Sequence, residues 1–82
     1  MPWYIVIDCG NRFDKGGPYP TEQMAMQNGQ MACTSGGALQ YYHFCINARR
    51  LDDAGPEIRQ KMLELGLPLK DIHRRQFKVK GQ

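Results

Sequence analysis

Trp3-Tyr4-Ile5-Val6-Ile7-Asp8-Cys9 is the stretch of sequence that decides the fold. Its aromatic and β-branched residues favour a β-strand. Alternation along such a strand places Trp3, Ile5, Ile7 and Cys9 on one face and Tyr4, Val6 and Asp8 on the other. Because apolar side chains occupy both faces, the pattern predicts a strand at an inner position of a sheet.

The segment from Ala38 to Arg50 can be interpreted in two ways. As a strand it places Tyr42, Phe44, Ile46 and Ala48 on one face. As a helix it has a stripe of Tyr41, Phe44, Cys45, Ala48 and Leu51. We favour the strand, because a helix here would end on Asp52 and Asp53, where the helix dipole disfavours acids. A third strand is predicted by the alternation from Ile72 to Lys80.

Two helices are predicted between these strands. The first begins at Thr21, a suitable N-cap, and should bury Met24, Ala25, Met31 and Ala32. Asn28-Gly29 could end it after two turns, and we slightly prefer the longer helix. The second has Pro56 at its first position and buries Ile58, Met62 and Leu65. It ends at Gly66, with Leu67 folding back on Met62.

The sum of these elements is an α+β fold in the order β-α-β-α-β. We expect a small single-layer antiparallel or mixed sheet with both helices on one face. Residues 1–82 should form one small globular domain with frayed C-terminal residues. The stretch from Gly10 to Pro20 is rich in Gly, Asn, Asp and Pro and is expected to form turns, with Arg12-Phe13 pairing briefly with the first strand.

Composition limits the cellular setting. The chain has 82 residues, and its N-terminal apolar run is too short for a signal peptide or a membrane span. The three cysteines are an odd number and suggest reduced thiols rather than a disulfide framework. We therefore expect a soluble cytoplasmic protein with no membrane partner.

Positive charge gathers at the C-terminal end. The net charge is +3, and residues 72–82 contain four basic residues and no acid. This basic segment could neutralise phosphates or meet an acidic protein surface, whereas a charged edge strand can also simply prevent aggregation. The candidate partner- or phosphate-binding residues are Arg49, Arg50, Arg74, Arg75, Lys78 and Lys80.

Several aromatic side chains and one methionine are of the kind that anchors protein interfaces. Met26 lies off the predicted stripe of Met24 and Met31, so it is expected to be the most exposed of the three. The candidate interface residues are Tyr19, Met26, Tyr41, Tyr42 and Phe77.

Catalytic and metal-binding patterns are weak. His43 and Cys45 are the only closely spaced ligand pair, and no cysteine has the setting of a nucleophile, so neither a metal, a cofactor nor a catalytic residue is predicted. Ile7-Asp8-Cys9-Gly10-Asn11 resembles the strand-to-turn phosphate loop of the actin-like sugar and acyl kinases. That fold closes two large domains on its nucleotide, which this chain is too short to build, so we interpret Gly10-Asn11 as a turn.

These observations favour a non-enzymatic binding protein that docks on a larger protein or nucleoprotein complex. Its small size and one-sided charge are typical of phage-type accessory proteins, including inhibitors of nucleic-acid machinery. The alternative is direct nucleic-acid binding through the basic C-terminal strand, and an enzyme ranks third. A homodimer is a further expectation, because one copy can bury only a thin core.

Overall fold

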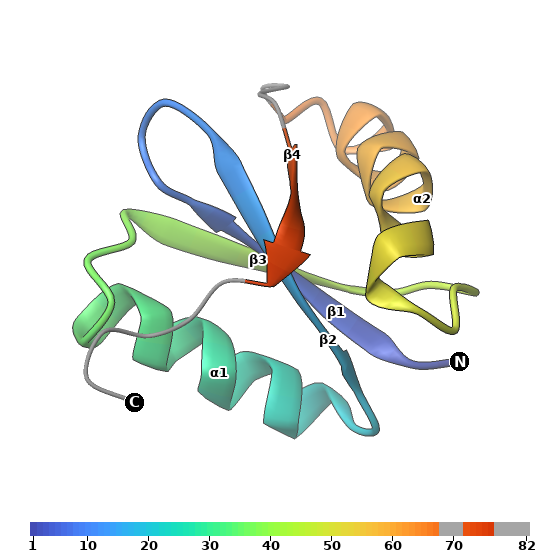
Figure 1. Cartoon of the computed structure of the whole chain (residues 1–82), viewed down its shortest axis with the longest axis horizontal. Helices are drawn as coiled ribbons and strands as arrows, with labels where there is room; N and C mark the ends of the chain where they lie inside the picture. Colours follow the sequence, from blue (N-terminus) through green and yellow to red (C-terminus); the bar gives the residue numbers. More distant parts are fainter. Residues whose placement is uncertain (68–71, 77–82) are drawn as a thin grey trace.

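The computed structural model describes residues 1–67 and the strand at 72–76. Four strands and two helices follow one another along this part of the chain (Figure 1). They are β1 (Trp3–Asp8), β2 (Phe13–Tyr19), α1 (Glu22–Thr34), β3 (Gln40–Cys45), α2 (Leu51–Glu64) and β4 (Ile72–Gln76). The α+β class is confirmed, and β2 is an addition to the predicted order.

The strands form one mixed sheet in the order β3-β1-β2-β4. β1 is antiparallel to both of its neighbours, whereas β4 is parallel to β2. The inner position predicted for β1 is therefore correct. Its residues 4–8 are all buried, as expected for a strand that is covered on both faces.

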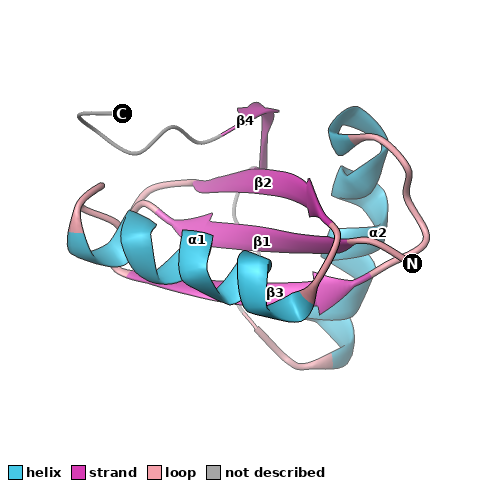
Figure 2. Cartoon of the chain, turned by 90° about the horizontal axis from the view of Figure 1, so that it is seen from below, coloured by secondary structure: helices cyan, strands magenta, loops and turns pink. Residues whose placement is uncertain are grey.

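The helices lie on opposite faces of the sheet, so the expectation that both share one face was wrong. Ile5 and Ile7 pack with Ala25 and Ala32 of α1 in one core, called the α1 core below. The alternate residues of β1 pack with α2 in a second core, called the α2 core below. It contains Tyr4, Val6, Ala54, Ile58 and Met62. Figures 1 and 2 show the sheet between the two helices. Without a second helix, the side chains of Tyr4 and Val6 would be exposed to solvent, and their burial stabilises the fold.

β2 runs through residues that were expected to form turns. Gly16 lies opposite Ile5 on β1, and a Cβ atom added to Gly16 would be 3.1 Å from the Ile5 side chain. Glycine is thus used here for close packing between strands rather than for a turn. The brief pairing expected for Arg12-Phe13 extends to a strand of seven residues.

α1 is the longer of the two predicted versions. Thr21 is its N-cap, and its hydroxyl accepts a hydrogen bond from the Met24 N–H at 3.2 Å. The buried face differs from the prediction, because Ala25, Gly29 and Ala32 are buried while Met24 and Met31 are exposed. Small residues face the sheet because the Tyr41 ring occupies the space beside Gly29.

The segment after α1 is a strand, as preferred over a helix. β3 pairs with β1 without a bulge, from Trp3 opposite Cys45 to Asp8 opposite Gln40. The face predicted for it is also confirmed, since Tyr42, Phe44, Ile46 and Ala48 all belong to the α2 core.

α2 begins five residues earlier than predicted. Leu51 is its first residue, so Pro56 lies inside the helix and not at its start. Asp52 and Asp53 consequently lie in the first turn, where the helix dipole favours acids. Ile58 and Met62 are buried as predicted, whereas Leu65 is exposed.

The end of α2 follows the prediction. Gly66 has φ +71°, its N–H donates to Leu63 O, and the Leu67 N–H donates to Met62 O. These bonds form a Schellman motif, and Leu67 packs against the α2 core beside Met62.

The predicted last strand is confirmed for residues 72–76, and its continuation to Lys80 lies outside the described residues. Within the described part of the chain, neither helix has the length and apolar character needed to cross a membrane.

Candidate protein-binding edge

The predicted basic residues lie on separate elements. Arg49 and Arg50 are exposed in the connection from β3 to α2, and the ion pair of Arg50 with Asp52 is long, at 3.9 Å. Arg74 and Arg75 are part of β4. Because β3 and β4 are the two opposite edges of the sheet, strand pairing does not join the two arginine pairs. Lys78 and Lys80 lie outside the described residues.

The predicted aromatic residues also do not form one patch. Tyr41 packs with the α1 core and Tyr42 with the α2 core, on opposite faces of the sheet. Tyr19 joins Tyr41 on the α1 side. Phe77 lies outside the described residues. Tyr41 and Tyr42 nevertheless share one strand, and that strand is an edge of the sheet.

Met26 lies on the side of α1 that faces this strand. Glu22 and Gly29 both contact β3, through His43 and Tyr41 respectively. Met26 lies four residues after Glu22 and three before Gly29, so helical periodicity places it in the same stripe. It is half-buried there, while Met24 and Met31 are 42% and 36% exposed, the reverse of the expected order.

The outer edge of β3 presents backbone groups that no described strand pairs with. The Ile46 N–H donates to Pro2 O at 3.2 Å, which makes this pair a hydrogen-bonded one. Hydrogen-bonded and non-hydrogen-bonded pairs alternate along an antiparallel ladder. The backbone groups of Gln40, Tyr42 and Phe44 therefore point toward β1, and those of Tyr41, His43 and Cys45 point away from the sheet.

The sequence of β3 lacks three features that often prevent edge-to-edge pairing. β3 contains no proline, lysine or bulge in its six residues. Moreover, the whole stretch from Gln23 to Ala48 contains no Asp, Glu, Lys or Arg, although these types make up 23% of the chain. Depletion of charge is typical of interface cores. This stretch was the signal in the sequence that could have indicated the edge before the structure was known.

Side-chain contacts hold the middle of β3 in place. His43 Nε2 lies 3.3 Å from Glu22 Oε2, and its ring is 5.7 Å from the Trp3 ring and 6.1 Å from the Tyr41 ring between centroids. Helix and strand are thus tied together at the centre of the edge. A strand that is already ordered loses less conformational entropy when it binds a partner.

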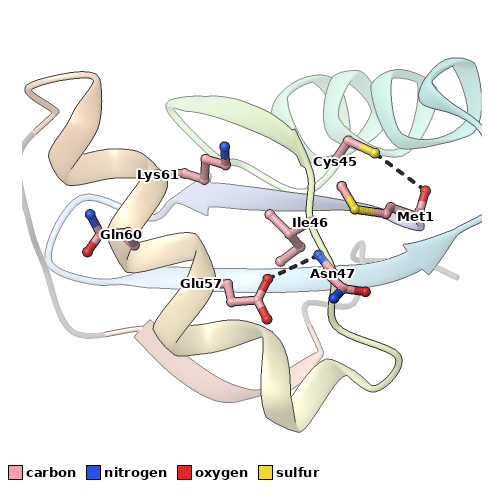
Figure 3. Close-up of a pocket in the computed structure, with 7 residues that line it drawn as sticks. All are labelled: Met1, Cys45, Ile46, Asn47, Glu57, Gln60 and Lys61. Atoms are coloured by element: carbon pink, nitrogen blue, oxygen red, sulfur yellow. Dashed lines mark hydrogen bonds between the residues drawn. The ribbon is translucent and has the colours of Figure 1, made fainter.

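A shallow pocket of about 260 Å³ adjoins the C-terminal end of β3 on the α2 side (Figure 3). Glu57 Oε2 accepts a hydrogen bond from the Asn47 N–H at 3.0 Å, and the Cys45 thiol donates to Met1 O at 3.4 Å. These contacts fix the walls of the pocket. The lining residues are Met1, Cys45, Ile46, Asn47, Glu57, Gln60 and Lys61.

The geometry gives metal and thiol chemistry no support. No group of three His, Cys, Asp or Glu side chains is placed to hold a metal among the residues that the structure describes. Burial and the neighbouring carboxylate of Asp14, whose Oδ2 lies 3.6 Å from the sulfur, raise the pKa of the Cys9 thiol. A raised pKa disfavours the thiolate that a nucleophilic cysteine needs. Asp8 accepts a hydrogen bond from the Gly10 N–H at 2.8 Å, which agrees with a turn at Gly10-Asn11.

Gly29 and Tyr41 provide a test of how α1 packs against β3. A Cβ atom at Gly29 would overlap the Tyr41 ring, so Gly29→Ala should lower the free energy of unfolding by about 1 kcal/mol or more despite the better helix propensity of alanine. In a Tyr41→Ala background the same change should raise it by up to about 1 kcal/mol. Urea denaturation of the four proteins in this double-mutant cycle measures the coupling. A stabilising effect in both backgrounds would contradict the packing described.

An edge strand that no other described strand pairs with, an adjoining pocket, and a flanking helix without charge after Glu22 can together accept an extended polypeptide. Main-chain hydrogen bonds would provide affinity, and side chains of the added strand would meet the pocket. No protein-family model, curated protein or solved structure matches this chain.

Proposed function

We propose that this protein is a non-enzymatic binding protein that associates with other polypeptides by strand addition to β3. The observation that carries the proposal is the outer edge of β3, where Tyr41, His43 and Cys45 direct their backbone groups away from the sheet. An extended segment can pair with these groups as it would with a neighbouring strand. Docking on a larger protein or nucleoprotein complex is one form of such association.

The absence of charge along β3 and along α1 after Glu22 supports protein binding over phosphate binding. Nucleic-acid affinity depends on Lys and Arg contacts and falls steeply with salt. The stretch from Gln23 to Ala48 offers no such residue. The basic candidates Arg49, Arg50, Arg74 and Arg75 belong to the connection after β3 and to β4, so nucleic-acid binding would use a different part of the molecule.

Site-specific photocrosslinking tests the proposal. A benzophenone amino acid at position 43 should form adducts with a bound polypeptide in cells that make this protein. The matched control places the same probe at Arg59, which is exposed on the charged helix α2. Adducts at position 43 and not at position 59 are expected.

The identified polypeptide is then purified and titrated against the wild-type protein and His43→Pro. Proline removes the outward N–H of residue 43 and should weaken binding at least tenfold, while Arg59→Ala should change it less than twofold. Binding should also change little between 50 and 500 mM salt, because strand addition uses uncharged backbone groups. Equal labelling at both positions, or binding that His43→Pro leaves intact, would overturn the proposal.

A further inference from the structure

We propose that the polypeptide that pairs with β3 is a second copy of this chain, in an antiparallel β3–β3 contact about a two-fold axis. This inference rests on the proposed function, because it names the occupant of the same edge. The resulting dimer would join two four-stranded sheets into one continuous sheet of eight strands.

Hydrogen-bond complementarity is the first argument for a second copy. The outward backbone groups belong to Tyr41, His43 and Cys45, which are evenly spaced about His43. We place the two-fold axis between the His43 residues of the two copies, which then lie opposite each other. Tyr41 of each copy lies opposite Cys45 of the other. Every outward N–H and C=O of β3 then has a partner.

The side chains agree with this register. Tyr42 of one copy lies opposite Phe44 of the other on the α2 side, in a non-hydrogen-bonded pair, where side chains approach most closely. Because the two-fold axis repeats this pair, the contact contains two Tyr42–Phe44 pairs. Cross-strand aromatic pairs are among the more stabilising in sheets.

Charge is the second argument. In a contact between identical surfaces, a charged residue at or next to the two-fold axis lies near its own copy and is repelled by it. The stretch from Gln23 to Ala48 contains no Asp, Glu, Lys or Arg, so this repulsion is absent along β3. Just before this stretch, Glu22 contacts β3 from α1, and its carboxylate lies 3.3 Å from His43 Nε2 of its own chain.

Single-cysteine crosslinking tests both the partner and the register. In a background with Cys9, Cys33 and Cys45 changed to serine, His43→Cys places two thiols opposite each other at the axis, about 5.5 Å apart between Cα atoms. This separation permits a disulfide, so treatment with diamide should yield a covalent dimer. The matched control is Gln40→Cys on the same strand, which lies opposite residue 46 of the other copy and should stay monomeric.

Sedimentation equilibrium of the unmodified protein should give twice the chain mass of 9.4 kDa. His43→Pro should raise the dimer dissociation constant at least tenfold while leaving the circular dichroism spectrum unchanged. A monomer mass at 100 μM protein, or equal crosslinking of His43→Cys and Gln40→Cys, would overturn the inference. If the protein is monomeric but a different polypeptide crosslinks to position 43, the second copy is excluded and the proposed function stands.

Discussion

Replacing Tyr4 by alanine is expected to remove most of the free energy of unfolding of this protein. The Tyr4 side chain is fully buried in the α2 core, and its hydroxyl donates a hydrogen bond of 2.6 Å to Ala48 O. Loss of a large buried aromatic side chain costs about 3–5 kcal/mol. Small domains have only about 5–15 kcal/mol in total, so a large fraction of Tyr4→Ala should be unfolded at 37 °C.

Tyr4→Phe is the matched control, because it keeps the ring and removes only the hydroxyl. It leaves the buried carbonyl of Ala48 without its donor, at a cost of about 1–3 kcal/mol. Burial and the nearby carboxylates of Asp53 and Glu57 raise the pKa of Tyr4, so this hydrogen bond should persist into alkaline solution. Urea denaturation followed by circular dichroism measures both variants. Equal losses would show that the hydrogen bond, not the ring packing, dominates at this position.

Gly17→Ala is expected to cost about 3 kcal/mol or more. Gly17 has φ +122°, a conformation that side chains rarely adopt. A Cβ atom there would also lie 2.9 Å from the backbone oxygen of Trp3 and 2.8 Å from the Tyr4 ring. Trp3 belongs to the central strand β1, which is paired on both sides, so its backbone cannot move away.

Gly37→Ala separates the cost of the positive φ from the cost of the close contacts with β1. Gly37 has φ +77°, but no atom of the described residues beyond its chain neighbours lies within 4 Å of the added Cβ, so its replacement should cost only the backbone strain of about 1–2 kcal/mol. Thermal and urea unfolding of both variants give the comparison. If Gly37→Ala proves as destabilising as Gly17→Ala, the contact with β1 contributes nothing.

The elements that could be predicted are those whose signals are local. β1 follows from its β-branched run, the start of α1 from Thr21, and the end of α2 from Gly66 and Leu67. Each depends on residues within a few positions of one another. The preference for a strand at β3 was correct for the same reason, because its aromatic residues alternate between the two cores.

The errors concern features that depend on distant residues. Gly16 and Gly17 are typical of a turn, but they belong to β2 because β1 lies close beside them. Met24 and Met31 are apolar enough to face the sheet, but the buried residues of α1 are Ala25, Gly29 and Ala32, and the Tyr41 ring occupies the space beside Gly29. The parallel pairing of β4 with β2 has no signature in either segment.

The candidate site was predicted only in part. Tyr41, Tyr42 and Met26 were named as interface residues, and all three lie on β3 or on the side of α1 next to it. The sequence could not show that these residues lie close together, because this depends on β3 forming an edge and on α1 packing over it. The charge-free stretch can be read from the sequence, but the sequence does not show that it forms an edge of the sheet.

β1 contributes successive residues to two different cores, Tyr4 and Val6 to one and Ile5 and Ile7 to the other. The two helices therefore do not contact separate halves of the molecule; each depends on the same short strand. Loss of either core frees β1 and exposes the apolar residues that the other core buries. Unfolding should consequently be a single cooperative transition, in which a probe near α1 and a probe near α2 report the same midpoint.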